Sequence, residues 1–318
     1  MTIWNHFSKF HSASFSQSYL QTSYESLQLE DAEKLAFTNC YPYIYHLEHA
    51  KKYYEQADNA PIEIQPMLLF YGMVQLMKAC ILTTDPHYPE NSQVLAHGVT
   101  TRKRKKIQYV FLQDEVKIQK NGLLSHFSSQ LFHFEQVTGE KYKMNQLLKQ
   151  LPELHPLFYH FTHKKIAYLV DLKNQFVTVP NSLLDDFHLS SSSYIEFLTN
   201  RGLKLDKNSV QESKDTFTFS IKNVISPIYS NPFLYSQDGN LYLPRSRDDY
   251  IGIPELLCHY LILYNLSMIC RYEVEWWSEL FRYYPETDFP FIEQFLTVTK
   301  EKVPFLIQAY LNKKKHMT

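Results

Sequence analysis

Apolar residues recur at helical intervals near both ends of this chain, and this pattern constrains its fold more than any other feature. Intervals of three and four residues predict an amphipathic helix over 43–57, with an apolar stripe of Tyr43, Leu47, Ala50, Tyr54 and Ala57. A separate, shorter helix is expected over 30–37. Another is expected from Pro66, a favourable residue in a first helical turn, to about Thr83, with Gly72 permitting close contact between helices.

The helical pattern returns near the end of the chain. It runs from Pro254 through Tyr284, and a final helix is expected over 291–312. Pro304 falls inside that final helix. Because proline lacks an N–H and its ring collides with the preceding turn, we expect the helix to bend or split there.

The middle of the chain is different, because β-branched and aromatic residues tend to alternate with polar ones. Asp238-Gly239, flanked by short apolar runs, predicts a hairpin. Short helices are expected over 143–151 and 182–187. The alternating pattern predicts strands over 107–120, 166–179, 194–205 and 216–224.

Helices at both ends around a β-rich middle predict an α+β protein that is predominantly α-helical. We expect a discontinuous helical bundle closed by the two ends of the chain, from residues 1–106 and 246–318. An α+β lobe, rich in β-strands, is expected as an insertion over 107–245. At 318 residues the chain is long enough to bury a large core.

Composition excludes several classes of protein. The net charge of -1 argues against a globally electropositive nucleic-acid-binding protein, so any such contact must use a local patch. The seven glycines are too dispersed for a phosphate cradle, and we expect no cofactor. The four cysteines form no C-x-x-C pair and lie in apolar segments, which favours reduced thiols and a cytoplasmic setting.

No segment predicts export or a membrane span. The first fifteen residues lack an apolar stretch after a basic start, so we expect no signal peptide. The most apolar run, 256–270, is shorter than the roughly 20 residues that a spanning helix needs, and it contains His259 and Asn265. We interpret it as a buried helix.

A dense basic run is the clearest candidate for nucleic-acid contact. It precedes an expected strand with Tyr109 and Phe111, so cations could meet phosphates while rings stack on bases. The alternative is a solvated loop. The run consists of Arg102, Lys103, Arg104, Lys105 and Lys106.

Tyr260, Tyr264, Ser267 and Arg271 are spaced by four, three and four, so they share one face of an otherwise apolar helix. One interpretation is a ligand pocket with Arg271 as the anion-binding group. The alternative is an ion pair between Arg271 and Glu275 one turn later, with the tyrosines bonded to backbone. A further charged group precedes this helix, at Arg245, Arg247, Asp248 and Asp249.

His97, followed by Gly98, also has two interpretations. A histidine at this place could act as a general acid or base. Alternatively, the pair ends a helix, with glycine in the left-handed conformation. Hydrolase and metalloprotease motifs are missing from the sequence, and neither His46/His49 nor His160/His163 has a convincing third ligand, so we expect no metal site.

Several of these segments together resemble the YaaC-like family of Gram-positive bacteria, a family with no assigned reaction. The matching residues are 43–57, 66–72 leading to Lys78-Ala79, His97-Gly98, and 266–272 with Trp276. The chain is also similar, more distantly, to HEPN-type helical domains, many of which cleave RNA through an Arg-x(4–6)-His motif. Here Asn91, Ser92 and Gln93 precede His97 and no arginine does, which removes the basis for transferring nuclease activity.

These observations favour a non-catalytic, HEPN-like protein that associates with RNA or regulates a partner protein. Two alternatives remain open. One is a metal-independent ribonuclease with a rearranged site of His97 and Arg271. The other is a sensor of a small anion or nucleotide at the strip of Tyr260, Tyr264, Ser267 and Arg271. We also expect a homodimer formed through the helical lobe, because closed twofold pairing is the commonest assembly.

Overall fold

The computed structural model describes residues 3–101, 109–135, 137–284 and 287–315. The protein is α+β and mainly helical, which confirms the expected fold class. It divides into two compact units. Unit 1 comprises Met1–Met144 together with His259–Thr318, and unit 2 comprises Asn145–Cys258.

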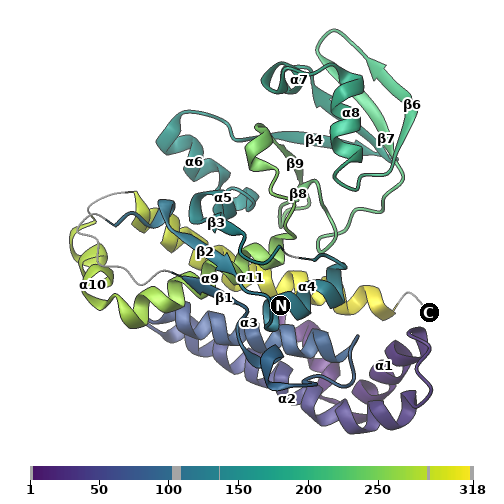
Figure 1. Cartoon of the computed structure of the whole chain (residues 1–318), viewed down its shortest axis with the longest axis vertical. Coiled ribbons are helices and arrows are strands. Elements are labelled where there is room, and N and C mark those ends of the chain that lie inside the picture. Colours follow the sequence, from purple (N-terminus) through teal and green to yellow (C-terminus); the bar gives the residue numbers. More distant parts are fainter. Residues whose placement is uncertain (1–2, 102–108, 136, 285–286, 316–318) are drawn as a thin grey trace. The chain divides into compact units, whose positions relative to one another are not determined.

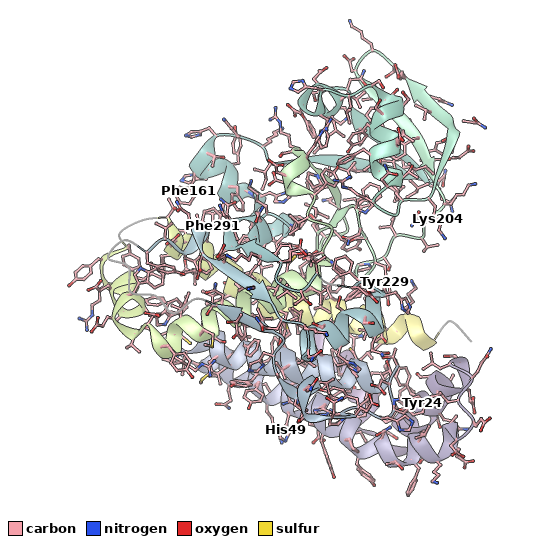
Figure 2. All side chains as sticks on the ribbon, in the orientation of Figure 1. Tyr24, His49, Phe161, Lys204, Tyr229 and Phe291 are labelled. Carbon is pink, nitrogen blue, oxygen red and sulfur yellow. The ribbon has the colours of Figure 1, made fainter. Side chains whose placement is uncertain are left out.

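Unit 1 is built mostly of helices drawn from both ends of the chain (Figure 1). Its long helices α2 and α3 pack against each other, and α1 packs against α2. Tyr24 on α1, labelled in Figure 2, is fully buried and its hydroxyl donates to the carbonyl of Leu82 at 2.7 Å. The helices before the first sheet are η1 (Ile3–His11), α1 (Ala13–Ser26), α2 (Ala32–Asn59) and α3 (Gln65–Leu82).

Helix α2 corrects one expectation, because it is continuous where the sequence predicted two separate helices over 30–37 and 43–57. Pro42 lies inside it, and the helix continues through the proline. Residues on both sides of Pro42, Cys40 and Tyr43, are buried in the same core, so packing on either side offsets the lost backbone hydrogen bond. The predicted apolar stripe over 43–57 is buried, as expected.

Helix α3 approaches α2 closely at Gly72. A Cβ at this position would lie 2.8 Å from two ring carbons of Tyr54, so only glycine fits here without displacement. The prediction of close helix contact at Gly72 is therefore confirmed. By length and composition α3 could cross a membrane, although 67% of that window is buried, as in the core helices of many proteins.

The C-terminal helices complete unit 1. They are α9 (Glu255–Tyr272), whose residues from His259 belong to this unit, α10 (Val274–Tyr283) and α11 (Asp288–Lys315). Helix α11 runs through Pro304 without splitting. It joins the two ends of the chain, since Lys9 Nζ donates to Asn312 Oδ1 at 2.8 Å and α11 packs against α3.

A small antiparallel sheet and one short helix complete the description of unit 1. The sheet has the order β1-β2-β3, with Val116 opposite both Thr101 and Tyr142. The strand predicted over 107–120 was only partly right, because Phe111–Gln113 forms a 3-10 turn and 107–108 lie outside the described residues. The elements are β1 (Val99–Thr101), β2 (Glu115–Ile118), α4 (Leu123–Phe132) and β3 (Lys141–Lys143).

Unit 2 contains an antiparallel sheet with the order β6-β7-β5-β4-β9-β8 (Figure 1). The β4–β5 turn uses positive φ angles at Asn174 and Gln175, and the predicted Asp238-Gly239 hairpin is confirmed as β8–β9. The strands are β4 (Ala167–Lys173), β5 (Phe176–Pro180), β6 (Leu205–Glu212), β7 (Thr216–Ile221), β8 (Leu234–Tyr235) and β9 (Leu241–Pro244).

Short helices in unit 2 correct one strand prediction. A strand was expected over 194–205, but residues 191–199 form α8, which Ser190 caps by accepting from the N–H of Ser193. Tyr194, Ile195 and Leu198 are buried on one helical face of α8, packed in the same core as the sheet residues Phe217 and Phe219. The helices are α5 (Met144–Leu148), α6 (His155–Thr162), α7 (Ser182–Phe187) and α8 (Ser191–Thr199).

Candidate functional site

The backbone of His97 is held by close contacts between two glycines. Gly98 has a φ of +76°, and a Cβ at Gly122 would lie 2.4 Å from Cα of Gly98. The N–H of Leu123 donates to the Ala96 carbonyl at 2.7 Å, which ties this loop to the start of α4. Since α3 ends at Leu82 and His97 follows a separate 3-10 turn, Ser92–Leu95, His97-Gly98 does not end an α-helix, but the expected left-handed conformation of Gly98 is observed.

The imidazole of His97 lies among aromatic rings of α3 and α9. Its ring centroid is 5.0 Å from that of Phe70 and 5.7 Å from that of Tyr264. The ring of Tyr71 is 6.4 Å away. The hydroxyl of Tyr260 donates to the carbonyl of His97 at 2.9 Å. The loop and the two helices therefore fix both the backbone and the ring of this histidine.

The surroundings of His97 keep its imidazole neutral. Burial lowers the pKa of His97, and the positive charges of Arg271 and Lys78 lower it further. Its Nδ1 is buried and forms no hydrogen bond with the described residues. The two cations thus act on the same imidazole, although they come from different helices.

Arg271 lies in the last turn of α9. Its Nε donates to the carbonyl of Ser267 at 2.8 Å, and its guanidinium lies 5.3 Å from the ring centre of Tyr272. It forms no ion pair with Glu275, which is exposed, so the expected ion pair was wrong, whereas Tyr260 does donate to backbone as that alternative expected. No other carboxylate among the described residues pairs with Arg271 either.

Lys78 is half-buried on α3, and burial lowers its pKa. Helical spacing places it on the same face as Tyr71 and Gln75, which are also half-buried. Within the described part of the chain, Lys78 pairs with no carboxylate. Tyr71 in turn stacks on Tyr53 of α2, with ring centroids 6.1 Å apart.

We call the group of Tyr71, Lys78, His97, Tyr264 and Arg271 the His97 site. It combines aromatic rings, one neutral imidazole and two cationic side chains. Half-buried cations usually face a carboxylate, because loss of hydration is costly. This site therefore has the chemistry to bind an anion, and its His97 is a neutral imidazole, the form of histidine that has a nitrogen able to accept a hydrogen bond or a proton.

Only two of the four residues in the predicted polar strip on α9 belong to the His97 site. Tyr264 and Arg271 contribute to the His97 site. Tyr260 positions the loop, and its buried hydroxyl is already engaged with His97. Ser267 donates to the carbonyl of Tyr264 at 2.8 Å within its own helix, so its hydroxyl serves the helix rather than a ligand.

Three other features considered in the sequence are the basic run, a metal site and the cysteines. The basic run Arg102–Lys106 lies outside the described residues. Among the residues that are described, no three His, Cys, Asp or Glu side chains gather to hold a metal ion. Cys40, Cys80, Cys258 and Cys270 form no disulfide with one another.

Sequence reasoning missed Lys78 as a member of the site. The available signal was a lone lysine within a strongly apolar helix, and that position belongs to the segment on which the family resemblance rests. Its electrostatic effect on His97 could not be found from spacing, because it acts between α3 and a loop beyond Leu82 whose backbone is held by the Gly98–Gly122 approach.

The fold and the site define an α+β protein with a discontinuous helical unit that carries a cationic, aromatic site. The chain belongs to the YaaC-like family, since the model described as YaaC-like Protein matches residues 8–311. This confirms the resemblance noted in the sequence. No curated protein and no solved structure matches the chain.

Proposed function

We propose that this chain is a non-catalytic regulatory protein whose helical unit binds an anionic ligand of the nucleotide class at the His97 site. One observation carries the proposal. Lys78 and Arg271, both half-buried and without carboxylate partners in the described residues, act on the same neutral imidazole. A phosphate group would supply the missing negative charge, and charge-assisted hydrogen bonds to phosphate are strong.

The aromatic content of the site supports a ligand that carries a ring as well as a charge. Tyr71 is half-buried and lies on the same face of α3 as Lys78, two turns away. Its stacking on Tyr53 extends a ring surface beside the cations. Stacking of a base on such a surface contributes about 1–3 kcal/mol.

The proton-transfer groups support binding rather than cleavage. Metal-independent cleavage of RNA needs one group to accept a proton and another to donate one. His97 supplies a neutral acceptor, whereas the pKa of Tyr264 is raised by burial and the guanidinium of Arg271 remains protonated. The ribonuclease-like alternative is favoured only by the low pKa of His97 beside Arg271.

RNA is a further proposed partner, through Arg102, Lys103, Arg104, Lys105 and Lys106. Its support comes from the sequence, since these residues lie outside the described part of the structure. A cytoplasmic location belongs to the same proposal and is supported by four cysteines that form no disulfide with one another.

Ligand-induced stabilisation tests the proposal. The full chain is heated with and without AMP and ADP, and affinity is measured by calorimetry. A ligand at 100 times its Kd stabilises the fold by about 2.7 kcal/mol. We expect Lys78→Gln to weaken binding by roughly tenfold or more, because a hydrogen bond to a charged group contributes about 1.5–3 kcal/mol.

Lys52→Gln is the matched control, because Lys52 is an exposed lysine on the neighbouring helix α2. Equal affinity of the Lys78 variant and the control would overturn the assignment of the site. The nucleotides and a labelled RNA are also analysed after incubation. Cleavage that is abolished by His97→Gln would replace the binding proposal with the ribonuclease alternative.

A further inference from the structure

Unit 2 contains a pocket of about 650 Å³. Three chain segments line it: residues 164–166 before β4, residues 186–188 at the end of α7, and residues 245–249 after β9. Pockets for small molecules have volumes of about 300–1,000 Å³, so this one has the size of a metabolite site. None of its residues belongs to the His97 site.

Strand pairing brings the basic segments together. Ala167 at the start of β4 lies opposite Pro244 at the end of β9, and the N–H of Arg245 donates to the carbonyl of Ile166 at 2.9 Å. The antiparallel pairing therefore continues one residue beyond the strands. As a result, Lys164 and Lys165, which precede β4, lie beside the segment after β9 that carries Arg247.

Some charges of the pocket are already neutralised. Arg245 donates from Nε and from a terminal nitrogen to the two oxygens of Asp186, at 2.5 and 3.0 Å. This pairing holds the pKa of Asp186 below its ordinary value. Asp249 is buried and accepts from Lys149 at 2.9 Å. These carboxylates are committed to neighbouring cations and do not neutralise the others.

The remaining charges are mainly positive. Within the described residues, Lys164 and Lys165 have no carboxylate partner. Arg247 donates from one terminal nitrogen to the Phe187 carbonyl at 2.9 Å, which orients its guanidinium and leaves its other N–H groups available. Against these three cations, one unpaired carboxylate lines the pocket, that of Asp248.

We propose that unit 2 binds a small molecule through a phosphate group held by Lys164, Lys165 and Arg247. The planar guanidinium and the lysine ammonium groups match the donors that phosphate prefers. Ile166 and Phe187 supply apolar lining for the rest of a phosphomonoester. This second anion site is independent of the proposed role of the His97 site.

Calorimetric titration of the full chain with inorganic phosphate and with glycerol 3-phosphate tests the inference. The double variant Lys164→Ser/Lys165→Ser should weaken binding by about tenfold or more, and Arg247→Gln should weaken it similarly. Asp248→Asn should tighten binding by about threefold, because it removes a like charge. Tighter binding of glycerol 3-phosphate identifies an organic phosphomonoester, and equal affinities identify inorganic phosphate.

The matched control is Lys204→Ser/Lys214→Ser, which removes the same charge from exposed sites in unit 2 away from the pocket. Lys204 is labelled in Figure 2. The affinity of the control variant for both phosphate probes should stay within about twofold of the parent affinity. The inference fails if neither probe binds at millimolar concentration, if the Lys164/Lys165 variant retains parental affinity, or if control and variant weaken equally. Arg271→Met should leave this binding unchanged, which separates the two sites.

Discussion

Replacing Arg271 with methionine tests the structure of the His97 site most directly. Methionine keeps most of the packing of the arginine stem and removes the guanidinium. The structure assigns that guanidinium a hydrogen bond to the Ser267 carbonyl at 2.8 Å, and such a bond contributes about 0.5–1.5 kcal/mol. Because Arg271 is not paired with Glu275, no buried carboxylate loses its partner.

We therefore expect the free energy of unfolding to fall by about 1 kcal/mol. Breaking a buried ion pair would instead cost about 3–5 kcal/mol. The assay is urea denaturation of the full chain at neutral pH. A second readout is the pKa of His97, followed by NMR of its ring protons. This pKa should rise, because one of the two cations that lower it has been removed.

Glu275→Gln provides the control, alone and combined with Arg271→Met. The double-mutant cycle should give a coupling energy below about 0.5 kcal/mol, as for residues that do not interact. A loss above about 3 kcal/mol in the single variant, recovered in part by the double variant, would refute this account and restore the ion pair. An unchanged pKa of His97 would show that the two side chains are not neighbours.

Four further outcomes are expected. The pKa of His97 in the folded state is below its ordinary value of 6.5, so the unfolded chain binds the proton first as the pH falls. The free energy of unfolding, measured by urea denaturation, should therefore decrease below about pH 6.5. The decrease should be smaller in His97→Gln. Gly72→Ala should destabilise unit 1 by about 1–3 kcal/mol, because the new methyl group collides with Tyr54; equal or greater stability would contradict this packing. Neutralising all five basic residues of 102–106 should preserve the fold and weaken RNA binding with a flatter salt dependence, and unchanged RNA affinity would make them a solvated loop. Light scattering should give the mass of a homodimer, and a monomer mass at all micromolar concentrations would remove that prediction.

The parts of the fold that follow local periodicity could be predicted from the sequence. The stripe over 43–57, the Pro66 start of α3 and the Asp238-Gly239 hairpin depend on spacing and turn chemistry within a few residues. The failure at 194–199 is instructive. Tyr194, Ile195 and Phe197 favour strands by residue type, but Ser190 caps a helix and the core accepts one face of it.

The candidate site was predictable to a smaller extent. Tyr264, Arg271 and His97 were identified as polar or titratable side chains in apolar surroundings, which is a local property. That these three residues share one site with Lys78 is a property of the tertiary structure, because it requires α3, α9 and the loop of Gly98 to lie together. The sequence also left two partners open for Arg271. Of the partners that a buried arginine can take, a carboxylate, a carbonyl or a bound anion, the structure shows a carbonyl, that of Ser267.

The joining of both chain ends in unit 1 has a consequence for biosynthesis. Lys9 and Tyr19 bind Asn312 and Leu311 of α11, so the early helices gain these partners only after α11 has emerged from the ribosome. Roughly 200 residues separate α3 from α11, which takes on the order of 10–40 s at about 5–20 residues per second. Unit 2 is contiguous and can fold during that interval. The nascent N-terminal helices expose apolar surface during that interval, so we expect chaperones that protect incomplete chains to bind this protein as it is made.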